Sequence, residues 1–305
     1  MKKVLITGGS GTIGISFIKE YYDEYNFYNV SRNGSNIAKL QQNYPKVTSF
    51  VCDICNLESL INIFEKVKPD VVIHTAALKH INLVEENPTQ AAEVNIVGSL
   101  NVIKASIRAA VPITVGVSTD KACDPSSMYG YTKSIMERMF MENYNEKTKF
   151  ICARFANVAG SNGSVIPLWK SLAEKGDPLK LTDPNMNRLM FSKRDAVHLI
   201  AQAISFAKHY DKPVVVCQKM KSVNMLNLAK MFSEDIIITG KRPGERLDEI
   251  LISGKELPYT RIIYDYIYIF SEKNSIVDNL LEEHSSATAE KMNATELQEL
   301  ISQCE

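Results

Sequence analysis

The chain has 305 residues and a mass of 34.2 kDa, and its 35 basic and 35 acidic residues give a formal net charge of zero. This balance argues against a nucleic-acid partner and against binding to an anionic membrane. No apolar run approaches the roughly 18 residues of a membrane span, and the first predicted strand leaves no room for a signal peptide. We therefore expect a cytoplasmic protein.

Short apolar runs alternate with helical patterns in the first half of the chain, as in a parallel sheet with crossover helices. Strands are predicted over residues 4–6, 27–30, 47–52, 71–74, 113–117 and 150–154. Helices are predicted over residues 13–22, 57–66, 91–110 and 126–143. This order predicts an α/β fold, the doubly wound parallel sheet of an NAD(P)-binding Rossmann domain.

The alternation loosens beyond residue 155. We predict helices over 167–175 and 195–209, strands over 179–181, 188–191 and 214–217, and short elements over 227–232, 236–239 and 262–270. The last thirty or so residues are polar and are expected to form a surface helix or a frayed tail. Residues 1–155, completed by about 193–217, should form the Rossmann domain, and residues 156–192 and 218–305 a smaller C-terminal substrate lobe and tail. The expected site is a cleft between them.

A glycine-rich loop joins the first predicted strand to the first helix. Gly8, Gly11 and Gly14 are spaced three residues apart, with Thr12 and Ile13 between the last two. The spacing differs from the G-x-G-x-x-G fingerprint of dinucleotide sites. The missing side chains still allow a pyrophosphate to approach backbone amides at a helix N-terminus. We expect this loop to bind a dinucleotide.

The residues after the second and third strands indicate which dinucleotide binds. Ser31 and Arg32 stand where an NAD site normally has an acidic residue, and an arginine suits the 2′-phosphate of NADP. NADP is therefore expected and NAD is less favoured; alternatively, Arg32 stacks on adenine or faces solvent. Asp53 and Ile54 are expected at the adenine, although Asp53 could equally cap the next helix. Room for the cofactor is left by two small residues after the fourth strand, Ala76 and Ala77.

Two acid–base pairs stand close together in the middle of the chain. Tyr129 and Lys133 share one face of a predicted helix, where the ammonium can lower the pKa of the phenol. Just before them, Thr119, Asp120 and Lys121 supply a second acid and base. Alternatively, the aspartate and lysine form a surface turn with a local ion pair. Behind a nucleotide loop, the two pairs indicate a redox enzyme that acts on a sugar.

The cysteines indicate no metal site. Cys52 and Cys55 match the C-x-x-C redox pattern, but the sequence has no second pair that would complete a zinc site. The spacing is therefore interpreted as a coincidence, and no metal is expected.

Several motifs together resemble one family, the extended short-chain dehydrogenase/reductases. The resemblance rests on the glycine loop at 7–14, the Ser-Thr-Asp-Lys turn at 118–121 and the Tyr-x-x-x-Lys pair at 129–133. More narrowly, the chain resembles the bacterial UDP-N-acetylglucosamine 4,6-dehydratases, and within them the soluble, C5-inverting type of the pseudaminic acid pathway. The segments that carry this resemblance are 77–80, 86–88, 118–122, 157–165 and 242–245. The chain departs from the usual residues of that family at Phe155, Asn187 and Asp248.

The resemblance implies a dehydration without net redox change. Tyr129, as phenolate, would take the proton of the sugar 4-hydroxyl while hydride passes from C4 to NADP+, and Lys133 would hold the phenol pKa down and bind the nicotinamide ribose. Lys121 would then remove the C5 proton, and Asp120, beside Thr119, would protonate the leaving 6-hydroxyl before hydride returns to C6. To act as a base, Lys121 should be partly desolvated, which lowers the pKa of an ammonium. The implied product is a UDP-4-keto-6-deoxy-hexose for surface polysaccharide or flagellin glycan.

The resemblance also implies contacts outside the two pairs. Lys79 would lie near cofactor and substrate, Val158 near the cofactor, and His80 is as well explained by a structural as by a functional role. Contacts to a UDP-linked N-acetylhexosamine are expected from Asn157, Asn162, Gly163, Ser164, Val165, Arg188, Arg242 and Glu245. The two arginines suit a diphosphate; alternatively, Arg188 is a solvated surface group. A homodimer or larger homo-oligomer, formed through the Tyr129 helix and the long helix before it, is implied as well.

Two other functions fit parts of the sequence. A nucleotide-sugar 4-epimerase or a 4-keto-sugar reductase would use Tyr129 and Lys133 but would not need Asp120 and Lys121. A non-enzymatic NADP(H)-binding regulator of the same fold would need neither pair. The sequence leaves open the stereochemistry at C5, the choice between UDP- and GDP-linked sugars, and the glycan made downstream.

Overall fold

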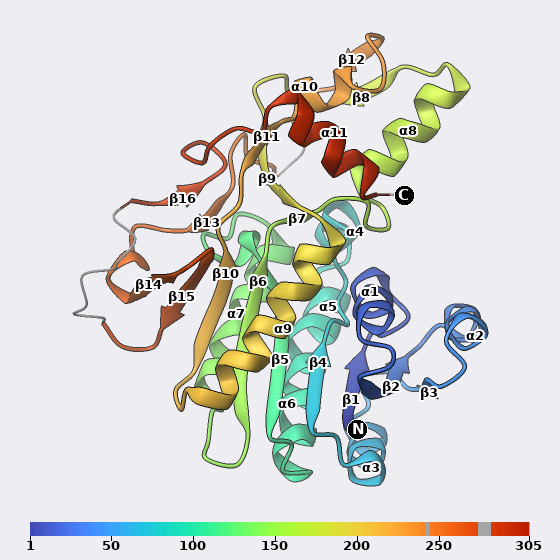
Figure 1. Ribbon diagram of the computed structural model, residues 1–305, viewed down its shortest axis with the longest axis vertical. Helices are drawn as coiled ribbons and strands as arrows, with labels where there is room; N and C mark the ends of the chain where they lie inside the picture. The colour runs from blue at the N-terminus through green and yellow to red at the C-terminus, as the bar shows by residue number, and fades with distance from the viewer. Residues whose placement is uncertain (242–243, 274–281, 305) are drawn as a thin grey trace.

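A nine-stranded sheet forms the larger part of the protein (Figure 1). The computed structural model describes residues 1–241, 244–273 and 282–304. The strand order is β14-β15-β10-β6-β5-β4-β1-β2-β3. The topological switch point, from which successive strands are added in opposite directions, lies between the parallel strands β1 and β4. The strands are β1 (Lys2–Thr7), β2 (Tyr25–Ser31), β3 (Thr48–Val51), β4 (Val71–His74), β5 (Ile113–Thr119), β6 (Lys149–Phe155), β10 (Val214–Gln218), β14 (Thr260–Ile263) and β15 (Tyr266–Phe270). All pairs from β3 to β10 are parallel, which confirms the predicted doubly wound sheet.

Helices cover both faces of this sheet (Figure 1). On one face α1 (Thr12–Glu20) packs against α9 (Lys193–His209), and on the other α3 (Leu57–Val67), α6 (Gly98–Arg108) and α7 (Met128–Glu142) follow one another. The apolar positions of these helices recur at helical spacing, as Leu60, Phe64 and Val67 do on α3, so each buries one stripe against the sheet. The carboxyl ends of β1, β4 and β5 therefore lie side by side at the point where the strand order reverses.

The predicted helix over 91–110 is a longer helix with an irregular turn. It runs as α5 (Pro88–Ala92), the π-helical turn η1 (Glu93–Val97) and α6. Asn95 lies in the π turn, is 1% exposed, and bonds both backbone groups of Leu78, at 2.8 Å to the amide and 2.9 Å to the carbonyl. Asn95 thus bonds, from inside the protein, the backbone of a segment that is distant in the chain. It fixes the chain that follows β4.

A second, smaller lobe lies beyond the carboxyl ends of the strands, at the top of Figure 1. Its elements are α8 (Val165–Lys175), α10 (Met225–Lys230), α11 (Ala294–Ser302), β7 (Asn157–Val158), β8 (Leu179–Leu181), β9 (Asn187–Phe191), β11 (Ser222–Asn224) and β12 (Ile236–Ile238). Trp169 and Leu228 are at the centre of its core. The tail expected at the surface contributes Leu297 and Leu300 of α11 to that core, so it is an integral part of the lobe.

Two segments differ from the sequence prediction. Residues 34–43, for which no element was predicted, form α2 (Gly34–Asn43), which begins at the N-cap Asn33. The run at 262–270, expected in the substrate lobe, is the antiparallel hairpin β14–β15, which joins the main sheet beside β10. Short elements complete the described chain: α4 (Ile81–Glu86), η2 (Asp120–Ala122), β13 (Ile250–Ile252), η3 (Leu257–Tyr259) and β16 (His284–Ser285). Over the described ranges, none of the helices combines the length and apolar character that a membrane crossing requires.

Candidate active site

The glycine loop after β1 packs too closely for side chains. Gly8 has φ +77°, and a Cβ on it would lie 2.8 Å from Thr75 Oγ1 and 2.9 Å from the Ala76 amide. Gly11 is the N-cap of α1 and donates its amide to the Gly8 carbonyl at 2.9 Å. With no side chain capping the helix, the first amides of α1 stay open to an anion. This cradle fits the pyrophosphate of a dinucleotide, as the sequence predicts.

Gly14 gives a direct test of the loop. A Cβ on this residue would lie 2.4 Å from the Gly9 Cα, so Gly14→Ala should push α1 away from the loop. Overpacking of this kind costs about 1–3 kcal/mol, and we expect dinucleotide binding to weaken about tenfold or more in calorimetric titration. Gly34→Ala, at the start of α2 with nothing within 4 Å of the added Cβ, is the matched control. Equal dinucleotide affinity in both variants would show that the cradle does not bind the cofactor.

The residues predicted at the adenosine end of the cofactor meet at the ends of β2 and β3. The Arg32 guanidinium lies 3.1 Å from the Asp53 carboxylate, and both side chains are about half exposed. Asp53 accepts the Cys55 amide at 2.9 Å, whereas Asn56 is the N-cap of α3, so Asp53 makes a turn and does not cap the helix. Burial acts to raise the pKa of Asp53, but the bonds from Cys55 and Arg32 lower it overall. Ile54 faces the core against Gly98.

The loop at residues 160–164 reaches across to the cofactor side. The Asn162 amide donates to Thr12 Oγ1 at 3.1 Å, and the Asn162 carbonyl accepts from Lys79 Nζ at 2.9 Å. Gly163 has φ +76° and lies against His80, whose ring would be 2.6 Å from an added Cβ. The loop predicted to contact the sugar diphosphate therefore contacts the nucleotide loop and the chain after β4. Ser164 and Val165, predicted in the same set, begin α8 as its N-cap and first residue.

The two acid–base motifs are brought together at the end of β5. Thr119 ends the strand, and Asp120 and Lys121 form the 3₁₀ turn η2. Gly130 allows α7 to approach this turn, because a Cβ on it would lie 2.4 Å from the Lys121 carbonyl. Tyr129, one residue earlier, consequently faces the charges of the turn. Gly130, between Tyr129 and Tyr131, thus allows the helix with Tyr129 to lie close to the turn with Asp120 and Lys121.

Tyr129 and Lys133 differ from the sequence prediction in their electrostatics. Burial raises the pKa of Tyr129 to about 12, and the charge that opposes this rise is the Lys121 ammonium. Lys133 is 3% exposed, lies 3.0 Å from the Met136 sulfur, and has its own pKa lowered by burial to about 8. Lys133 is not among the main influences on the phenol pKa here, and its expected effect on the phenol stays a prediction. The cation next to the phenol is the lysine of the other motif.

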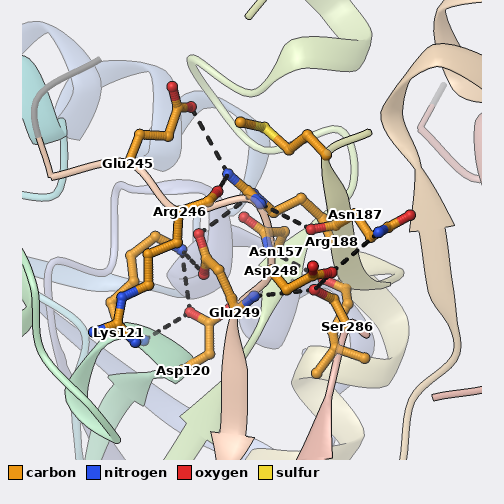
Figure 2. A network of polar contacts seen from close by, with 12 residues as sticks. Asp120, Lys121, Asn157, Asn187, Arg188, Glu245, Arg246, Asp248, Glu249 and Ser286 are labelled. Atoms are coloured by element: carbon orange, nitrogen blue, oxygen red, sulfur yellow. Dashed lines mark hydrogen bonds and ion pairs between the residues drawn. The ribbon is translucent and has the colours of Figure 1, made fainter. Parts of the chain in front are cut away.

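A buried charged network surrounds Lys121 (Figure 2). Its ammonium lies 3.1 Å from Asp120 Oδ1 and 2.5 Å from Glu249 Oε2. Glu249 Oε1 lies 3.3 Å from Arg188 Nε. Glu249 comes from the segment before β13 and is 8% exposed. The sequence prediction missed this glutamate; the available signal was its position four residues after Glu245, at the start of an apolar run.

The groups of this network shift one another's pKa values in different directions. Burial and the nearby Glu249 carboxylate raise the pKa of Asp120. Burial opposes ionisation of Glu249, but Lys121 and Arg188 hold its pKa well below the usual range. Burial acts to lower the pKa of Lys121, yet the two carboxylates raise it overall. The predicted desolvated lysine of low pKa is therefore wrong: in this arrangement Lys121 is firmly cationic, and Asp120 is the group that retains a proton near neutrality.

Arg188 is buried and its donors are largely used within the chain. It donates to the carbonyls of Asn187, Leu247 and Arg246 at 2.8, 2.9 and 2.9 Å, and its guanidinium lies 3.8 Å from Glu245. It is thus not the solvated surface group considered as an alternative, and it holds the segment 245–249 in place. Its predicted contact with a diphosphate stays a prediction.

The other predicted substrate residues lie on the strands and loop beside this segment. Asn157 donates to the carbonyl of Leu189 at 3.1 Å, which ties β7 to β9. Val158, the second residue of β7, is half-buried. Arg242 lies outside the described residues.

Comparisons with known proteins identify the family and the fold. The family model described as polysaccharide biosynthesis protein matches residues 4–272. The chain belongs to this family. It is 32% identical to the UDP-N-acetylglucosamine 4,6-dehydratase (inverting) of Campylobacter jejuni over 95% of this chain and 89% of that one. It is 33% identical to the capsular polysaccharide biosynthesis protein CapD of Staphylococcus aureus over 93% of this chain, but it spans only 51% of that relative's length.

Solved structures share this fold, and a further relative is named as an enzyme of nucleotide sugars. The structure of Pen from Bacillus thuringiensis has a TM-score of 0.90 and 29% identity, covering 99% of this chain and 97% of that one. A UDP-glucose 4-epimerase of Rickettsia bellii is 29% identical over 98% of this chain and 95% of its own. A dTDP-glucose 4,6-dehydratase of Streptomyces venezuelae, solved with NAD, has a TM-score of 0.68 at 20% identity and covers 80% of this chain and 87% of that one. The predicted Rossmann fold of the extended short-chain dehydrogenase/reductases is confirmed, and the relatives include dehydratases and epimerases of nucleotide sugars.

Proposed function

We propose that the protein is a nucleotide-sugar 4,6-dehydratase that acts on UDP-N-acetylglucosamine and inverts C5. The observation that carries this proposal is the pairing of Tyr129 and Lys133 with a second, buried acid–base group of Asp120, Lys121 and Glu249. A single oxidation and reduction at C4 needs only the first pair. Removal of a proton at C5 and of water from C6 needs a further base and acid.

Each side chain has a separate part in the proposed reaction. A bound dinucleotide supplies the hydride acceptor at C4 and the hydride donor at C6. Tyr129 takes the proton of the 4-hydroxyl, assisted by the neighbouring Lys121 ammonium, which opposes the rise in the phenol pKa. The Lys121 ammonium then gives up its proton to solvent, the free amine accepts the C5 proton, and Asp120 donates its proton to the leaving hydroxyl at C6. The raised pKa of Asp120 suits a general acid, because a carboxyl must hold its proton in order to give it away.

A 4-epimerase is the second candidate function. It is favoured by the similarity to a UDP-glucose 4-epimerase over nearly the whole chain. It would use Tyr129 and Lys133 but would give no work to the buried Asp120 and Lys121. The dehydratase is therefore preferred.

Proton NMR in D2O tests the two functions directly. The purified protein is incubated with UDP-N-acetylglucosamine without added cofactor. A new 6-methyl signal, with deuterium incorporated at C5, is expected, and the product couplings report the configuration at C5. An anomeric signal of UDP-N-acetylgalactosamine without a methyl signal would establish the epimerase. An unchanged spectrum would exclude this substrate for both functions.

NADP is proposed as the resident dinucleotide, although the related structure named above holds NAD. Support comes from Arg32, which directly follows β2, is half exposed and pairs with the similarly exposed Asp53. A guanidinium in this position suits a 2′-phosphate.

The Arg32→Ala variant is expected to lose preference for NADP. A hydrogen bond to a charged group is worth about 1.5–3 kcal/mol, so NADP+ affinity should fall about ten- to a hundredfold while NAD+ affinity stays unchanged. Calorimetric titration with both dinucleotides measures this. Lys39→Met, at an exposed lysine of the neighbouring α2, should alter neither affinity. Equal losses for NADP+ and NAD+ would contradict a role at the 2′-phosphate.

A homodimer through η1, α6 and α7 is also proposed. These elements pack against one another and expose four apolar side chains, 41–51% accessible: Val97, Ile107, Tyr131 and Ile135. Ile135→Glu is expected to shift the protein to monomers in light scattering, because a buried unpaired charge is costly. Leu168→Glu, on the distant α8, is the control. An unchanged mass for Ile135→Glu would place any contact elsewhere.

A further inference from the structure

Lys121 lies between two carboxylates that come from different parts of the fold. Asp120 is its neighbour in the chain, whereas Glu249 is 128 residues away and belongs to the segment before β13 (Figure 2). The shorter of the two contacts is that with Glu249, at 2.5 Å against 3.1 Å. The Lys121 side chain is 18% exposed and that of Glu249 is 10% exposed, so water screens this pair weakly.

Glu249 is itself fixed from several sides. Its amide donates to Ser286 Oγ at 3.0 Å, and its carbonyl accepts the Ser286 amide at 2.9 Å. Its second carboxylate oxygen lies 3.3 Å from Arg188 Nε. The titratable groups that face Lys121 are thus Asp120 from η2, Glu249 from the segment before β13, Arg188 from β9 and Tyr129 from α7. Glu249 is thus held by two hydrogen bonds to Ser286 and by its contact with Arg188.

We propose that Glu249 is a positioning residue that holds the Lys121 amine in the site and sets what fraction of it is free to accept a proton. The inference rests on the proposed function, in which the C5–H bond breaks, the proton bonds to the lone pair of the Lys121 nitrogen, and the electrons remain in the enolate of the 4-ketone. Only an uncharged amine has that lone pair. The carboxylate of Glu249 therefore lowers the fraction of Lys121 that is uncharged, while it keeps the Lys121 nitrogen in place.

The neutral fraction of Lys121 is measurable without catalysis. Cyanate carbamylates uncharged amines, so the labelling rate of Lys121, read by peptide mass spectrometry, follows its deprotonation. In the wild-type protein half-maximal labelling is expected above the ordinary lysine pKa of about 10.4. One nearby opposite charge shifts a pKa by about 1–3 units, so Glu249→Gln should increase labelling at fixed pH about ten- to a thousandfold. The exposed Lys175 serves as internal reference.

The adjacent Asp248 offers a matched control. Its carboxylate bonds Asn187 Nδ2 at 3.0 Å and Ser286 Oγ at 2.9 Å, one residue away from Glu249. Asp248→Asn removes the same charge and is expected to leave Lys121 labelling unchanged. The pH dependence of deuterium exchange at C5 should agree: its rising limb moves to lower pH by about one unit or more in Glu249→Gln only.

The outcomes separate this inference from the proposed function. Unchanged Lys121 labelling in a folded Glu249→Gln protein would overturn it, as would an equal increase in Asp248→Asn. If Glu249→Gln does not fold, the wild-type profile decides: titration of Lys121 below about 10.4 would also overturn the inference. A labelling shift without any 6-methyl product would leave Glu249 in control of the amine and refute the dehydratase alone.

Discussion

Replacing Lys121 with methionine is expected to abolish the 6-methyl product while leaving oxidation at C4 in place. A well-placed acid or base contributes about 10²–10⁴ to the rate, and the loss should be of this size. Methionine keeps the length of the side chain, and Glu249 retains Arg188 as a partner, so the protein should still fold. Turnover is measured by the methyl signal in proton NMR, and C4 oxidation by the absorbance of the reduced nicotinamide that accumulates.

The separation of the two steps is the informative part of this result. The Lys175→Met variant, at an exposed lysine near the end of α8, should behave as wild type. Product formation by Lys121→Met within a few-fold of wild type would remove Lys121 from the C5 step. Equal loss of oxidation and dehydration would instead mean that the lysine acts mainly through Tyr129, because its charge opposes the rise that burial causes in the pKa of the phenol.

The Arg154→Met variant is expected to lose about 3–5 kcal/mol of stability, because it leaves the buried Glu137 carboxylate and the partly buried Glu256 carboxylate without their partner. Arg154, on β6, is 2% exposed and bonds both oxygens of Glu137, at 2.9 and 2.7 Å, and both oxygens of Glu256, at 2.8 and 3.1 Å. It also donates to the Leu251 carbonyl at 2.9 Å. Urea unfolding at neutral pH measures the loss.

The dependence of this loss on pH follows from Glu256. Burial acts to raise its pKa, but Arg154 lowers it overall. A carboxyl with a depressed pKa contributes stability that is present above its unfolded value of about 4.3 and is lost as the pH falls through the folded value. The difference between wild type and Arg154→Met should therefore narrow below about pH 4. The control is Arg108→Met in the exposed pair with Glu65, where a loss below about 1 kcal/mol is expected. Similar losses at both sites would contradict a special role for the buried network.

The parts of the fold that the sequence predicted are those with local signals. Apolar runs separated by helical patterns located β1 to β6, and the spacing of Gly8, Gly11 and Gly14 located the loop that α1 follows. The residues of the candidate site on one strand end, from Thr119 to Lys121, were predictable because the carboxyl ends of parallel strands meet. Each of these features can be recognised from a short stretch of sequence.

The parts that the sequence did not predict depend on distant contacts or weak signals. Glu249 reaches Lys121 across 128 residues, and its local signal, a place four residues after Glu245 before an apolar run, is too weak to mark it as part of a site. The polar helix α2 buries only Ile37 and Leu40, which is too few for a clear period. The hairpin β14–β15 turns through Tyr264 and Asp265, and Tyr264 has φ +56° without being a glycine, so the glycine that usually signals such a turn is missing.

The hairpin β14–β15 has a consequence for how the chain folds as it leaves the ribosome. Strand β10 carries Val214, Val215 and Val216 and is covered on its outer edge by β15, which is synthesised about fifty residues later. Until that segment emerges, an apolar edge stays open to pairing with another nascent chain. Chaperone dependence during synthesis should therefore be greatest while residues 219–265 are being made.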